Sequence, residues 1–153
     1  MSPRKTSAIA VFLMAVLVVF VGVLPSAFAV DDTTAIQHVM KGTWEKPGAP
    51  LRVEPIVVVG DHAIAGWVQG DMGGRALLRR KAGAWMVVLC SGDALKSADE
   101  LKKAAVPADQ AVTLAKSLAD AESRLDPALL TQFAKFEGLV MMDQSGHHPP
   151  HHR

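Results

Sequence analysis

The side chains with the clearest chemical potential gather at the C-terminal end of the chain. Imidazole nitrogen is a borderline-soft ligand that suits Cu(II), Ni(II) and Zn(II), and short His-rich tracts are typical of metal binding. Two prolines, Pro149 and Pro150, favour an extended arrangement of the histidines on either side of them. The pattern predicts a tail that captures a metal ion without imposing a rigid geometry, and its ligands would be His147, His148, His151 and His152.

Two thioethers and a carboxylate stand just before this tail. Met141 and Met142 carry soft sulfur donors that select Cu(I), and Asp143 offers oxygen. Together with the imidazoles they would suit copper in either oxidation state, so the sequence indicates copper as the metal. Methionine also fills irregular gaps in hydrophobic cores, and these three residues are therefore secondary candidates.

Cys90 is the only cysteine in the chain, which excludes an intramolecular disulfide. Free cysteine is among the most buried residue types, so we expect a buried, structural thiol. In an up-and-down sheet the turn that carries His62 lies at the opposite end from Cys90, and a Cys–His nucleophilic pair is not expected. Met72 and Asp93 belong to the Cys90 end, which leaves a soft-metal site of Cys90 and Met72 as a weaker alternative.

No other pattern in the sequence points to catalysis. The glycine-rich stretch 70–74 lies between two predicted strands, which favours a hairpin turn over a phosphate loop. Arg75, Arg79, Arg80 and Lys81 form a basic run without interleaved aromatic residues, which favours a solvated strand edge over a nucleic-acid groove. Paired catalytic carboxylates, a zinc-protease motif and a dinucleotide fingerprint are all missing from the sequence. We therefore expect a protein that is not an enzyme.

The N-terminal segment is typical of a secretory signal peptide. Arg4 and Lys5 precede the run Ala8–Leu24, which contains no charged residue, and a helix breaker and small residues follow it. We predict that residues 1–29 are removed by cleavage after Ala29 and that the mature chain is periplasmic. Retention as a membrane anchor is the alternative, because the apolar run approaches the ~18 residues that span a bilayer. Cleavage removes two basic residues and no acid, so the formal charge of +1 changes sign.

Residues 30–142 contain the elements that must position these groups. An acidic and hydroxylated start at Asp31, followed by apolar residues at helical spacing, predicts a helix that ends before Pro47. Short β-rich runs separated by turn residues predict an antiparallel meander, and three helix starts follow it. The β-rich runs are 51–59, 63–69, 75–80 and 84–90, and the helix starts lie at Ser97, Pro107 and Asp126.

These elements predict a single α+β domain with an N-terminal helix, a four-stranded antiparallel meander and C-terminal helices, the helices lying on one side of the sheet. We expect Gly138 to end the last helix, and residues 139–142 to form a brief further strand or to pack on the sheet. Strict alternation along the fourth strand places Cys90 on the face opposite Trp85. Both faces of that strand are apolar, so we expect it to be central in the sheet or covered twice. Residues 143–153 are predicted to be disordered.

Five segments of the chain resemble one small family of bacterial proteins. They are Trp44–Pro47, Ala49–Leu51, Gly60–Trp67, Gly73–Arg79 and Leu89–Asp93, and the likeness runs from about Thr33 to Met142. In this combination the chain is similar to the copper uptake system-associated proteins, periplasmic proteins with a His-rich end that are encoded beside copper chaperones and copper-importing outer-membrane receptors. The resemblance implies a copper context, with chaperones or uptake proteins as partners. It assigns no role to the cysteine of the last segment.

The leading hypothesis is a periplasmic copper-handling accessory protein that captures or relays copper for an uptake system. The alternative is a non-enzymatic binding module for a small molecule or a partner protein. A helix laid on a curved meander encloses a pocket in the cystatin-like and nuclear-transport-factor-like folds, and this analogy concerns the fold alone. A thiol enzyme built on Cys90 ranks last.

Overall fold

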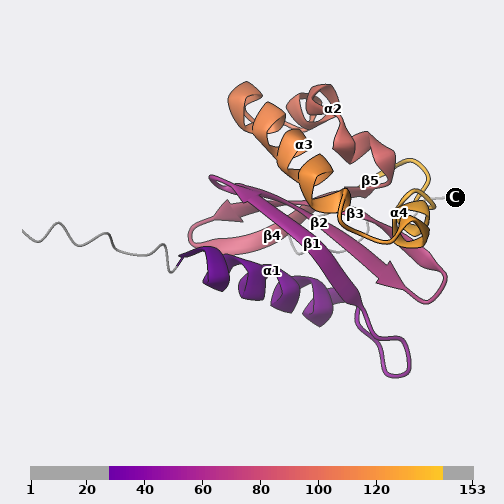
Figure 1. Cartoon of the computed structure of the whole chain (residues 1–153). Helices are drawn as coiled ribbons and strands as arrows, with labels where there is room; N and C mark the ends of the chain where they lie inside the picture. The colour runs from indigo at the N-terminus through magenta and orange to yellow at the C-terminus, as the bar shows by residue number, and fades with distance from the viewer. Residues whose placement is uncertain (1–27, 143–153) are drawn as a thin grey trace, which may run out of the picture.

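The computed structural model describes residues 28–142, and predictions about residues 1–27 and 143–153 lie outside this range. Within it the chain folds into helices and one antiparallel sheet, whose five strands lie in the order of the sequence (Figure 1). The helices are α1 (Phe28–Trp44), the 3-10 helix η1 (Asp93–Lys96), α2 (Ala98–Lys103), α3 (Ala108–Glu122) and α4 (Pro127–Phe133). The strands are β1 (Arg52–Val59), β2 (His62–Gln69), β3 (Met72–Lys81), β4 (Ala84–Ser91) and β5 (Leu139–Met141).

The predicted meander of four strands is confirmed, and its connections are tight. Each of the first three hairpins joins its strands through two residues. The last pair of each ladder lies directly beside the turn, as Val59 and His62 do in the first hairpin. Gly60, Gly70 and Gly83 have positive φ in these turns, a conformation that costs glycine little and that two-residue hairpins require. The turn predicted over 70–74 is shorter than expected, because β3 already begins at Met72.

Helices cover both faces of the sheet, so the expectation of helices on one side holds for the C-terminal helices and is wrong for α1. Ile36 of α1 packs with Ala65 on one face, called here the α1 face. Leu114 of α3 packs with Ile64 and Leu77 on the opposite, α3 face, and α2 lies on that side too. Figure 1 shows α1 below the sheet and α2 and α3 above it. Side chains alternate between the faces of a strand, and each apolar face needs its own covering layer.

A β-bulge in β4 changes the face on which Cys90 lies. Leu77 pairs with Leu89 while Leu78 pairs with Val87, which leaves Val88 without its own partner on β3. The extra residue shifts the alternation by one position. Cys90 therefore joins Trp85 and Val87 in the core of the α1 face, and the predicted placement on the opposite face is wrong. The prediction that β4 is covered on both faces is confirmed, and β5 extends the sheet beside it.

The helix starts after the meander form where the sequence predicts them. Ser97 is the N-cap of α2 and accepts a hydrogen bond from the backbone N–H of Glu100, and Asp126 caps α4 in the same way. The last helix ends at Phe133, and not at Gly138 as predicted. Gly138 has a φ of +80° and lies directly before β5.

Helix α1 begins at Phe28, ahead of the predicted start at Asp31, and ends at Trp44, before Pro47 as predicted. In the part of the chain that the structure describes, no helix has both the length and the apolar character needed to cross a membrane.

Candidate functional site

The predicted metal ligands fall into two groups. Those outside the described residues are Asp143, His147, His148, His151 and His152. Met141 and Met142 are described, and they lie on opposite faces of the sheet, because Met141 pairs with Leu89 on the α3 face and neighbouring side chains alternate. Among residues 28–142, no group of three or more His, Cys, Asp or Glu side chains is placed to hold a metal ion.

A cavity of about 210 Å³ lies on the α1 face, between the C-terminal end of α1 and strand β5. Its walls combine aromatic rings, two sulfur-bearing side chains, two aliphatic side chains and one amide. Trp67 and Phe136 meet edge to face, with ring centroids 5.8 Å apart and planes at 79°, an arrangement that aromatic pairs favour. The wall includes Trp44, Trp67, Gln69, Cys90, Phe136 and Met142.

Gln69 lies in the cavity wall and is hydrogen-bonded to two backbone groups beside it. Its side-chain amide donates hydrogen bonds to the backbone carbonyls of Trp44 (2.9 Å) and Ala49 (2.8 Å). These bonds tie the end of α1 and the loop after it to strand β2.

Cys90 is buried, as predicted, with 4 % of its surface exposed. Loss of solvation raises the pKa of its thiol to about 12, so the thiol is protonated at neutral pH and is a poor nucleophile. His62 lies on the other face of the sheet, where its Nδ1 is 2.9 Å from Oε1 of Gln110, and the expected separation of Cys90 and His62 is confirmed. Met72 is half exposed at the β2–β3 hairpin. The thioether that shares the cavity with Cys90 belongs to Met142.

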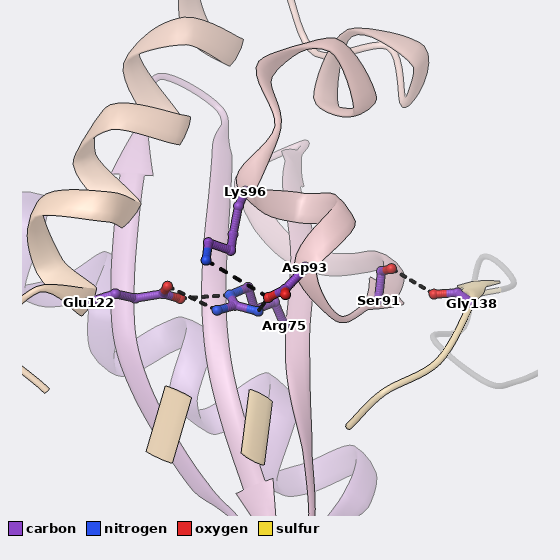
Figure 2. Close-up of polar contacts among 6 residues, drawn as sticks. All are labelled: Arg75, Ser91, Asp93, Lys96, Glu122 and Gly138. Atoms are coloured by element: carbon purple, nitrogen blue, oxygen red, sulfur yellow. Dashed lines mark hydrogen bonds and ion pairs between the residues drawn. The ribbon is translucent and has the colours of Figure 1, made fainter. Parts of the chain in front are cut away.

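The residues after Cys90 fix the segment that leads into β5. The hydroxyl of Ser91 donates a 2.6 Å hydrogen bond to the carbonyl of Gly138, as Figure 2 shows. Gly92 packs so closely that a Cβ there would lie 2.5 Å from the carbonyl oxygen of Phe136. Together with the β4–β5 pairing, these contacts hold Phe136 and Met142 in the cavity wall.

Arg75 lies at the centre of a buried ion-pair network beside this segment. Its guanidinium donates two hydrogen bonds to the carboxylate of Glu122, at 2.6 and 2.9 Å, and one to Asp93 at 3.1 Å (Figure 2). It also stacks over the ring of Phe133, with 5.3 Å from Cζ to the centroid. Arg75 is 1 % exposed, so its predicted place on a solvated basic edge is wrong. The network joins β3, α3, η1 and α4 and is satisfied internally.

The sequence pattern does not indicate which residues line the cavity, because its walls come from positions far apart in the chain. Trp44, Trp67 and Cys90 belong to three separate segments, and the fold brings these segments to one place. The arrangement suits the binding of an apolar group. It does not activate a nucleophile, since the Cys90 thiol has neither a depressed pKa nor a base among the residues that line the cavity with it.

No family model, no curated protein and no solved structure matches the chain.

Proposed function

We propose that the protein is an exported, non-enzymatic accessory protein that captures or relays copper for an uptake system. The observation that carries the proposal is the concentration of imidazoles at the C-terminus, with four histidines in residues 147–152. Nitrogen ligands of this kind bind Cu(II) well, and copper forms the most stable complexes among the divalent metals of its row. The resemblance to copper uptake system-associated proteins supports copper as the cargo.

The folded domain supports this proposal by giving the tail a fixed starting point. Met142 donates its backbone N–H to the carbonyl of Val88 at 2.9 Å, which extends the β4–β5 pairing to the last described residue. His147 follows five residues later in the sequence. The nearest of the histidines, His147, is therefore tethered within about 18 Å of Met142 and the farthest, His152, within about 36 Å, since an extended chain spans at most ~3.6 Å per residue. The thioether of Met142 offers a soft donor near the base of the tail, and periplasmic chaperones or uptake proteins would receive the metal.

Copper titration of the mature protein tests the proposal. The test variant carries His147→Asn, His148→Asn, His151→Asn and His152→Asn. The matched control is His38→Asn, because His38 is an exposed imidazole on α1. We expect the tail variant to lose the tightest Cu(II) site and the control to retain it. Unchanged copper affinity in the tail variant would contradict the proposal and favour the alternative, a module that binds a small molecule or a partner protein.

The predicted export can be tested separately. N-terminal sequencing of the protein recovered from the periplasm should begin at Val30. A mature chain that still begins at Met1 would show that residues 1–29 are kept.

A further inference from the structure

The cavity on the α1 face has walls that suit an apolar and electrically neutral occupant. Three of its lining residues are aromatic (Trp44, Trp67 and Phe136), and no lining residue carries a charge. Its volume is about 210 Å³. An apolar cavity of ~150 Å³ accommodates a benzene molecule, so this cavity has room for one or two small rings.

We propose that the cavity binds the proline pair Pro149-Pro150 of the chain's own C-terminal segment. Met142 forms part of the cavity wall and is also the last described residue. Pro149 follows seven residues later, and the intervening chain spans up to ~25 Å at 3.6 Å per residue. The prolines are thus tethered within easy reach of the cavity, and a short flexible tether gives an effective concentration on the order of millimolar.

The chemistry of the two partners matches. Proline-rich segments dock in grooves lined by aromatic side chains, because their extended conformation is already formed and little entropy is lost on binding. Pro149 and Pro150 are the only apolar residues in the segment 143–153. The histidines on either side of them would remain at the mouth of the cavity, outside its apolar walls. This contact does not depend on the copper function proposed above.

Indole N–H signals in NMR spectra of the metal-free mature protein test the proposal. The test variant carries Pro149→Ser and Pro150→Ser, and Trp85 is an internal reference, because its Nε1 donates to Asp32 at 2.9 Å and it does not line the cavity. We expect the indole signals of Trp44 and Trp67 to differ between the mature protein and the variant, and that of Trp85 to stay in place. Adding a synthetic peptide of residues 144–153 to the variant should move the two signals back.

A second variant separates this contact from metal capture. Replacing the four tail histidines by asparagine keeps both prolines, so the Trp44 and Trp67 signals should keep their positions in the mature protein even where copper binding is lost.

Three results would overturn the proposal. The first is that the Trp44 signal and the Trp67 signal each have the same position in the mature protein and in the proline variant. The second is a dependence of these signals on protein concentration, which would assign the cavity to a second copy of the chain. The third is a small molecule that is released from the purified protein on unfolding and identified by mass spectrometry.

Discussion

Removing the carboxylate of Glu122 should destabilise the domain severely, because it leaves a buried guanidinium with one solvent-exposed partner. Arg75 is 1 % exposed and Glu122 is 5 % exposed at the side chain, whereas the remaining partner, Asp93, is 64 % exposed. Breaking one side of a buried ion pair typically costs 3–5 kcal/mol, so we expect Glu122→Ala to lower the free energy of unfolding by about that amount. This is a large fraction of the roughly 5–15 kcal/mol that stabilises a typical domain.

Urea unfolding followed by circular dichroism measures this loss. Asp99→Ala is the matched control, since it removes a carboxylate that pairs with Lys102 at 2.6 Å but is 79 % exposed, and it should shift the midpoint little. The double variant Arg75→Met, Glu122→Leu should recover much of the lost stability, because a buried pair replaced by apolar side chains is often neutral. Equal midpoints for Glu122→Ala and Asp99→Ala would show that breaking the buried pair costs no more than breaking an exposed one.

Further predictions concern the cavity wall and its surroundings. Burial raises the pKa of Cys90 from about 9 to about 12. The contribution of the protonated thiol to stability is therefore present below pH 9 and is lost as the pH rises towards 12. At pH 10.5 the free energy of unfolding of the wild type should have fallen by about 2 kcal/mol relative to that of Cys90→Ala. Iodoacetamide should label Cys90 only after unfolding, and rapid labelling of the native protein would contradict its burial. Gly92→Ala should cost about 1–3 kcal/mol, because its Cβ would lie 2.5 Å from the carbonyl oxygen of Phe136. Gly42→Ala, with nothing within 4 Å of the added Cβ, should instead stabilise α1 by about 0.5–1 kcal/mol. A lower melting temperature for Gly42→Ala than for Gly92→Ala would contradict the close packing at Gly92.

The parts of the fold that local sequence determines were predictable. The hairpin turns follow from glycine conformational freedom, and the caps at Ser97 and Asp126 follow from side chains that accept a hydrogen bond two or three residues away. Strand ends therefore agree with the pattern to within one to three residues. Each of these features involves residues that are neighbours in the chain, so a single sequence contains the information.

The features that depend on distant residues were not predictable. The bulge at Val88 exists only in relation to its partner strand, and it reverses the face on which Cys90 lies. Arg75 is buried because Glu122, 47 residues later, neutralises it. Two apolar faces on β4 indicated two covering layers, but nothing in the local pattern assigned α1 to one face and α3 to the other.

The candidate site also has a part that local sequence indicates and a part that depends on distant residues. The imidazole cluster could be recognised from composition alone, because its four histidines lie within six residues of the chain. The cavity could not, because Trp44, Trp67, Cys90 and Met142 come from four separate elements or loops. The adjacent residues Met141 and Met142 look like a pair in the sequence, and the alternation of β5 separates them.

Electron paramagnetic resonance of the Cu(II)-loaded mature protein tests the claim that the tail histidines bind copper, because it reports which atoms bind the metal. We predict nitrogen hyperfine splitting from imidazole ligands, its loss when His147, His148, His151 and His152 are replaced by asparagine, and its retention in His38→Asn. A nitrogen signal that survives in the tail variant, or a wild-type spectrum identical to that of free copper in buffer, would contradict the claim.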